Sequence, residues 1–119
     1  MKTVLLSILL LSFAFLSSNQ GFAKSRRFRL YTVEINGVKM WMPSTIIVNK
    51  GDTVELHIQS KLPDSKSVHG FTIADYKIVE VADHNGKNIK FTADKPGAFD
   101  IKCHLHETHI GGQLLVQDR

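Results

Sequence analysis

The residues best suited to chemistry in this sequence lie together in one short stretch, Cys103 to His109. The stretch contains the only cysteine of the 119-residue chain and three of its six histidines, His104, His106 and His109. A thiolate and imidazoles form a borderline-soft ligand set that suits copper, zinc or iron. A spacing of three residues separates Cys103, His106 and His109, so the side chains of one loop can converge on one ion. The stretch predicts a metal site, and the alternative is a buried free cysteine beside solvated histidines.

A strand is expected to lead directly into this cluster. Residues 98–103 alternate in period two, which places Phe99, Ile101 and Cys103 on one face. Cys103 should therefore point inward at the end of that strand. Beyond the cluster, Gly111-Gly112 interrupts the chain, and residues 113–116 are typical of a closing strand. A loop held between two strands is a rigid support for a metal.

The remaining histidines differ in their expected surroundings. His69 lies on the inward face of a predicted strand, 68–74, at the end nearest a loop. His57 falls on the outward face of a neighbouring strand, and His84 lies in a turn, so both are expected in solvent. His104 should face away from Cys103 because successive side chains of a strand alternate, and it is only a minor ligand candidate.

The body of the chain is typical of β-structure throughout. Short alternating stretches are separated by turn signals about every 8–12 residues, such as Asn36-Gly37 and Lys95-Pro96-Gly97. No helical periodicity, internal repeat or low-complexity segment competes with this pattern. We predict an all-β fold, an antiparallel Greek-key β-sandwich. The expected strands are 28–35, 44–49, 53–59, 68–74, 76–81, 89–93, 98–103 and 113–116.

Residues 1–23 are expected to be a cleaved signal peptide. Lys2 precedes an apolar run from Val4 to Leu16, and Gly21-Phe22-Ala23 offers small residues at the cleavage positions. This run is too short to span a bilayer comfortably, so we expect no stable membrane insertion. Residues 24–119 should form one periplasmic or secreted domain with a single core.

The charge of this chain is mildly basic. The formal net charge is +4, and it falls to +3 without the leader, which holds one lysine and no acidic residue. Such a surface allows steering toward an acidic partner, although a solvated tail also explains the basic cluster at 24–29. Export and the lack of a binding motif argue against nucleic acid. With one cysteine no internal disulfide can form, and the oligomeric state stays open.

Three passages of the sequence resemble the cupredoxin family. They are residues 43–54, His69-Gly70-Phe71, and 91–109, which follow one another in the family's order and cover most of the region after the leader. The nearest likeness is to nitrosocyanin-like cupredoxins, and it is carried by residues 91–95 and 97–99. The resemblance implies a copper-binding β-sandwich outside the cytoplasm, in a family that consists mostly of electron carriers.

The resemblance also implies a ligand set for one copper ion per chain. Cys103 takes the position of the thiolate ligand, and His69 and His106 take those of the imidazole ligands. His109 stands where short-loop blue copper proteins have a methionine, so it would replace a weak axial thioether with an imidazole. The chain departs from its nitrosocyanin-like relatives at His69, where they have a carboxylate. A thiolate with two imidazoles and a weaker fourth ligand is the arrangement of electron-transfer copper sites.

We expect a one-electron carrier with a redox protein partner, and no catalytic residues. One alternative is a copper-handling protein, either a chaperone or a tolerance factor. Another is a nitrosocyanin-like copper enzyme or sensor with an open coordination position. The alternative metal is zinc, held in a structural site of one cysteine and three histidines. Met40-Trp41-Met42 is expected to be core packing rather than a thioether patch for copper.

Overall fold

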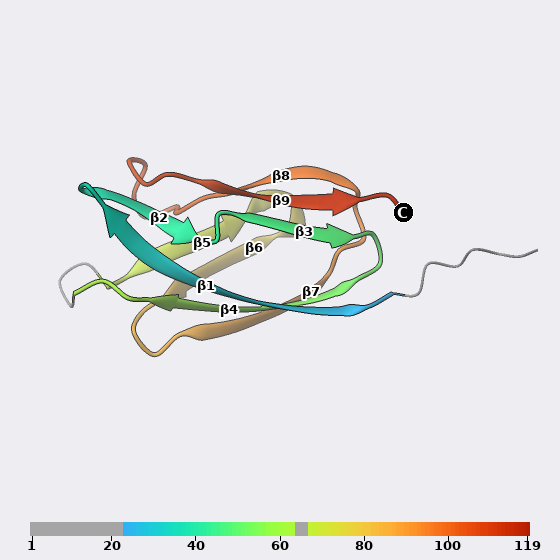
Figure 1. Cartoon of the computed structure of the whole chain (residues 1–119), viewed down its shortest axis with the longest axis horizontal. Helices are drawn as coiled ribbons and strands as arrows, with labels where there is room; N and C mark the ends of the chain where they lie inside the picture. Colours follow the sequence, from blue (N-terminus) through green and yellow to red (C-terminus); the bar gives the residue numbers. More distant parts are fainter. Residues whose placement is uncertain (1–22, 64–66) are drawn as a thin grey trace, which may run out of the picture.

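The structure is a computed structural model, and it describes residues 23–63 and 67–119. In these residues the chain forms nine strands and one short 3-10 helix (Figure 1). The expected signal peptide lies outside the described residues except for Ala23. None of the helical structure in this part of the chain is long and apolar enough to cross a membrane. The elements are β1 (Ser25–Ile35), β2 (Val38–Met42), β3 (Thr45–Asn49), β4 (Thr53–Ser60), β5 (His69–Ile73), η2 (Ala74–Tyr76), β6 (Ile78–Ala82), β7 (Lys87–Thr92), β8 (Gly97–Ile101) and β9 (Gly112–Gln117).

The strands form two facing layers, as Figure 1 shows. One layer is a four-stranded sheet in the order β2-β1-β4-β7, and the other contains the sheet β3-β9-β8 and the hairpin β5-β6. An antiparallel bridge between Thr72 and Lys102 joins this hairpin to the end of β8. The predicted all-β sandwich is therefore confirmed.

Two of the strand pairs run parallel, whereas the sequence suggested antiparallel pairing throughout. They are β1 with β4 and β3 with β9, and the other pairs in the described residues are antiparallel. The reason lies in the connections. After β2 the chain crosses to the second layer as β3 and then returns, so β4 enters the first layer in the same direction as β1.

The core lies between the two layers and follows the alternation of the sequence. In β4, Val54, Leu56 and Ile58 are each at most 1% exposed, while the residues between them are half-buried. Buried side chains of both layers join these residues in one continuous cluster. Each such side chain contributes about 1.5–3 kcal/mol when it is fully removed from water.

The β1–β2 hairpin places Trp41 in this core. Asn36 and Gly37 have φ angles of +51° and +78°, the left-handed conformation that a two-residue hairpin turn requires. The turn sets a register in which Trp41 faces Thr32, and both side chains are buried. The interpretation of Trp41 as core packing is confirmed.

The strand before the metal-site candidates is shorter than predicted. β8 ends at Ile101, so Cys103 lies beyond the strand rather than on its last residue. Directly after β8, Lys102 forms two backbone hydrogen bonds with Thr72 of β5, of 2.9 and 3.0 Å. This bridge keeps the chain that leads to Cys103 beside β5.

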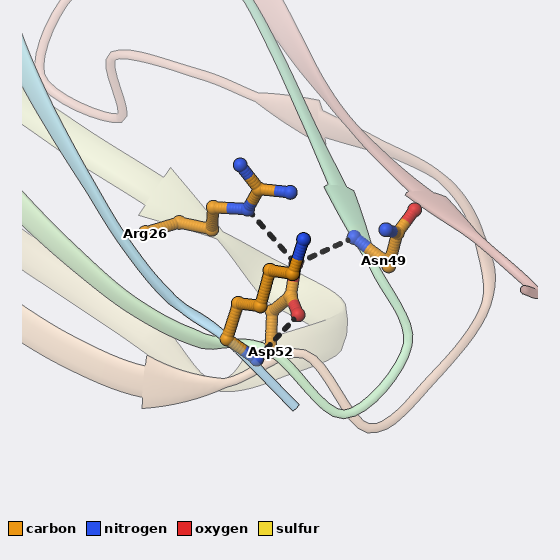
Figure 2. A network of polar contacts seen from close by, with 4 residues as sticks. Arg26, Asn49 and Asp52 are labelled. Atoms are coloured by element: carbon orange, nitrogen blue, oxygen red, sulfur yellow. Dashed lines mark hydrogen bonds and ion pairs between the residues drawn. The ribbon is translucent and has the colours of Figure 1, made fainter. Parts of the chain in front are cut away.

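A buried carboxylate joins the two layers at the end of the sandwich remote from Cys103. Asp52, only 2% exposed, accepts hydrogen bonds from the backbone N–H groups of Lys24 (3.0 Å) and Asn49 (2.9 Å) (Figure 2). It also accepts one from Arg26 Nε at 3.4 Å. Burial alone would raise the pKa of Asp52, but these donors and the charge of Arg26 outweigh it and lower the pKa.

Replacing this carboxylate should weaken the fold and change its acid sensitivity. We expect Asp52→Asn to lower the free energy of unfolding by about 2–3 kcal/mol at neutral pH, since hydrogen bonds to a charged group are lost. Because the folded-state pKa lies below the ordinary value of 3.8, the contribution of Asp52 is present above that pH and disappears as the pH falls through the folded-state pKa. Urea unfolding at pH 7 and at pH 3 measures both effects.

The matched control is Glu55→Gln, because Glu55 is a partly exposed carboxylate that pairs with Arg27 and Lys90. This change should cost less than about 1 kcal/mol. An Asp52→Asn variant as stable as the Glu55→Gln variant would contradict the assigned role.

Candidate metal centre

Two consecutive turns bring the predicted side chains of the β8–β9 loop together. The N–H of His106 donates to the carbonyl of Cys103, and the N–H of His109 donates to the carbonyl of His106, each at 3.3 Å. Such hydrogen bonds close turns of four residues, whose first and last residues lie close together. The three-residue spacing of Cys103, His106 and His109 thus places these residues near one another.

The far end of this loop is fixed to β2 and to the start of β3. The N–H of Ile110 donates to the carbonyl of Lys39 at 3.0 Å, and the N–H of Gln113 donates to the carbonyl of Ser44 at 2.8 Å. Gly112 is needed for this approach, because a Cβ atom there would lie 2.1 Å from the carbonyl oxygen of Ser44. Any side chain at Gly112 would push the loop away from β3.

The fourth side chain comes from β5 and is held by the core. His69 is the first residue of β5 and is 2% exposed, as the inward register predicted. Trp41 packs edge-on against its ring, with 6.4 Å between the ring centroids. The indole N–H of Trp41 donates to the carbonyl of Gly70 at 3.0 Å, which fixes the indole next to His69. The sequence offered Trp41 only as core packing, and the hairpin register was the signal for its place beside His69.

The four predicted candidates form one group, the metal-site group. His69, Cys103, His106 and His109 each offer a ligand atom, and these atoms lie within 4.8 Å of one another. The ring centroids of His106 and His109 are 4.4 Å apart, and those of His69 and His109 are 5.0 Å apart. In the described part of the chain this is the one such group found. One sulfur and three imidazole nitrogens around a common point fit a borderline-soft ion such as copper.

The three other histidines lie apart from this group and have partners of their own. His57 shares a hydrogen bond with Asn88 on the outer face of the first layer. His84 contacts the carbonyl of Leu62, and His104 shares a hydrogen bond with Thr72. His104, the minor candidate, is therefore directed away from the metal-site group.

The sulfur of Cys103 has contacts that suit a thiolate. Cys103 is a free, half-buried cysteine, and the N–H of Gly70 donates to its Sγ at 3.2 Å. His106 Nδ1 lies 3.6 Å from the same sulfur. The thiolate is the form of cysteine that binds metals, and the Gly70 amide is placed to donate a hydrogen bond to it. Sequence reasoning missed Gly70, because a backbone donor leaves no mark on residue type.

His109 is neutral in these surroundings. Burial, together with the nearby His106, His69 and Lys39, lowers the pKa of His109 from 6.5 to about 4. A histidine must be neutral to bind a metal, so His109 needs to release no proton near pH 7. A surface hollow borders the group and is lined by Cys103, His106 and His109 together with Thr72, Lys102, His104, Glu107 and Gly111.

Comparison with known proteins adds a family and a set of structural neighbours. A family model described as "Cupredoxin-like domain" matches residues 6–116. No curated protein sequence matches the chain. Among solved structures, a copper nitrite reductase from Nitrosomonas europaea is 20% identical, with a TM-score of 0.60, over 81% of this chain and 42% of its own.

Two further structures show the same fold at similar distance. The multicopper oxidase mgLAC is 16% identical with a TM-score of 0.57, over 80% of this chain and 39% of its own. A copper-containing nitrite reductase from Thermus scotoductus is 22% identical with a TM-score of 0.57, over 80% of this chain and 28% of its own. The chain thus spans less than half the length of these neighbours.

The low pKa of His109 can be tested on metal-free protein. We expect its ring protons to titrate near pH 4 in NMR spectra. Since the folded-state pKa lies below the ordinary value of 6.5, the unfolded chain binds more protons between these values. The free energy of unfolding should therefore decrease as the pH falls from about 6.5 toward 4, and His109→Gln should reduce that slope. A midpoint for His109 near 6.5 would show that it is solvated outside the group.

Proposed function

Because this chain belongs to the cupredoxin-like domain family, we propose that it is an exported protein that binds one copper ion and carries single electrons. The observation that carries the proposal is the convergence of His69, Cys103, His106 and His109 within 4.8 Å. Four protein donors around one ion leave its surroundings little changed between oxidation states, which suits electron transfer rather than substrate binding. The family and the copper proteins among the structural neighbours support copper as the metal.

Each part of the site has a task in this function. Copper bound there supplies the one-electron chemistry, by alternating between its two common oxidation states. Cys103 provides the thiolate, with the Gly70 amide bonded to its sulfur. Trp41 would hold the buried His69 ring in place, and His109 would offer a neutral imidazole to the metal. Because a hydrogen bond to the sulfur withdraws charge from it, the Gly70 amide should favour the reduced metal.

Electrons would enter and leave through the exposed end of the β8–β9 loop. His106 is exposed, and beside it Leu105 and Ile110 are 44% and 51% exposed. An apolar surface around an exposed ligand ring suits brief contact with a redox protein. On the outer face of the first layer, away from this loop, Arg27, Arg29 and Lys90 surround the single acid Glu55. This basic face would attract an acidic partner by long-range steering rather than by contact at the loop.

Export follows from the sequence of residues 1–23, which we propose to be a signal peptide that is cleaved before Lys24. The mature domain would then work in the periplasm or outside the cell, with no stable membrane insertion. Its one cysteine would be protected from stray disulfide exchange by the metal, because a coordinated thiolate is less available for reaction.

A second candidate is a nitrosocyanin-like copper enzyme or sensor. The hollow that borders Cys103, His106 and His109 favours it, because a small molecule could approach the metal there. This function needs one of the four donors to stay away from the metal. A copper-handling protein would use the same four donors but would release the metal reversibly, and a zinc site would be colourless.

Removing the thiolate should abolish the copper spectrum. We expect protein loaded with Cu(II) to show strong thiolate-to-copper absorption in the visible region, and Cys103→Ser to lose it while keeping the β-sheet circular dichroism of the parent. His57→Ala is the matched control, because this histidine lies on the outer sheet face with Asn88 and should leave the spectrum unchanged. Visible colour that persists in Cys103→Ser would show that the metal binds elsewhere.

His109 should set the colour and the reduction potential. An imidazole is a stronger axial donor than a thioether, so the parent should absorb at shorter wavelengths than a blue copper protein and appear green or red. His109→Met should shift the spectrum toward blue and raise the potential, by about 60 mV for each tenfold change in the preference for Cu(I). If His109→Met and His109→Ala both keep the parent spectrum and potential, the site has three ligands, Cys103, His106 and His69.

A further inference from the structure

Strand β5 is joined to the residues around Cys103 by contacts on both sides of the sulfur. Before Cys103, Thr72 and Lys102 form two backbone hydrogen bonds, of 2.9 and 3.0 Å. At Cys103 itself, the N–H of Gly70 donates to Sγ. After it, the hydroxyl of Thr72 and Nδ1 of His104 share a hydrogen bond of 2.7 Å. Thr72 thus takes part in two of these three connections.

The ring of His104 lies directly over Gly70. A Cβ atom on Gly70 would lie 2.5 Å from Nδ1 and 2.8 Å from Cε1 of His104, and 2.9 Å from its backbone nitrogen. Only glycine permits this approach, and the same approach brings the Gly70 N–H within reach of Cys103 Sγ. His104 is itself exposed and lies outside the metal-site group, so neither burial nor ligation accounts for its position.

We propose that His104 and Thr72 form a latch that positions the sulfur of Cys103. The hydrogen bond between them holds the chain after Cys103 against β5, which keeps Sγ beside the Gly70 amide and close to His69. His104 is a positioning residue in this arrangement, since it acts through Cys103 and does not touch the metal. Neither latch partner belongs to the metal-site group, so the latch needs no metal to position the thiolate.

The latch also has a consequence for electron transfer, and this part rests on the proposed function. Hydrogen bonding to the cysteine sulfur is one of the determinants of the potential of a copper–thiolate site. A released latch should lengthen the Gly70 N–H···Sγ contact and leave more charge on the sulfur. The oxidised metal would then be favoured, and the reduction potential would fall.

The test compares Thr72→Val and His104→Ala with the conservative Thr72→Ser and with His57→Ala as a matched control. In metal-free protein we expect Thr72→Val and His104→Ala to increase both the hydrogen exchange of the Gly70 amide and the alkylation of Cys103 by iodoacetamide about fivefold. That factor corresponds to the loss of one hydrogen bond of ordinary net strength. Thr72→Ser and His57→Ala should stay close to the parent, and the double variant should not exceed the larger single effect.

Several results would overturn the latch. Unchanged exchange and alkylation in both Thr72→Val and His104→Ala would show that the backbone bridge alone holds the sulfur. A Thr72→Ser variant that behaves like Thr72→Val would exclude the hydroxyl as the determinant. Cooperative urea unfolding of every variant shows that the fold is intact. Thr72→Val is suited to the test because valine nearly preserves the shape of the threonine side chain.

The copper-loaded proteins separate this inference from the proposed function. If the latch and the copper site are both correct, the potential falls in Thr72→Val and His104→Ala and stays unchanged in His57→Ala. If the metal-free variants behave as expected but the parent takes up no copper, the latch is kept and the copper function is rejected. If the parent binds copper, and Thr72→Val and His104→Ala keep its potential, hydrogen exchange and alkylation, the copper function is kept and the latch is rejected.

Discussion

The arrangement of the metal-site group depends on the two hydrogen-bonded turns that run from Cys103 to His109. Each turn brings together a pair of residues three apart, so Cys103, His106 and His109 lie close to one another. A loop of the same composition without these turns would scatter the side chains, because seven consecutive residues have many backbone conformations of similar energy. The hydrogen bonds at Ile110 and Gln113 then fix this preformed unit to the sandwich.

The sandwich supplies the one candidate ligand that the loop cannot provide. His69 lies on a strand whose position is set by Trp41 and by the pairing of Thr72 with Lys102. A buried imidazole on a strand moves little, whereas a loop adapts. The metal-site group thus combines one side chain fixed by the core with three from a single loop. Asp52 performs the comparable task at the other end, where it joins the start of β1 to the turn after β3.

The sequence was sufficient to predict the fold class and the four residues that gather in the metal-site group, and the reasons are local. Alternation in β4 marks Val54, Leu56 and Ile58 as core, and the spacing of Cys103, His106 and His109 matches the period of the turns that hold them. The inward register of His69 follows from Phe71 and Ile73 in the same way.

What the sequence could not show depends on distant or backbone groups. The parallel pairing of β1 with β4 arises from crossings between layers, and the bridge between Thr72 and Lys102 joins residues far apart in the sequence. The amide of Gly70 and the position of His104 above it involve a residue with no side chain. The residue types of Gly70 and His104 do not predict that they lie in contact.

The directions of β1 and β9 place both ends of the folded domain far from the histidines. Ser25 of β1 pairs with Thr53, and Gln117 of β9 pairs with Asn49, so both terminal strands meet the same β3–β4 turn. The metal-site group lies at the opposite end of the sandwich, where β9 begins and β8 finishes (Figure 1). A tether, a fused protein or an electrode linker attached at either end would therefore leave the surface around His106 accessible. This geometry also suits a module that is built into longer polypeptides without loss of access to the metal-site group.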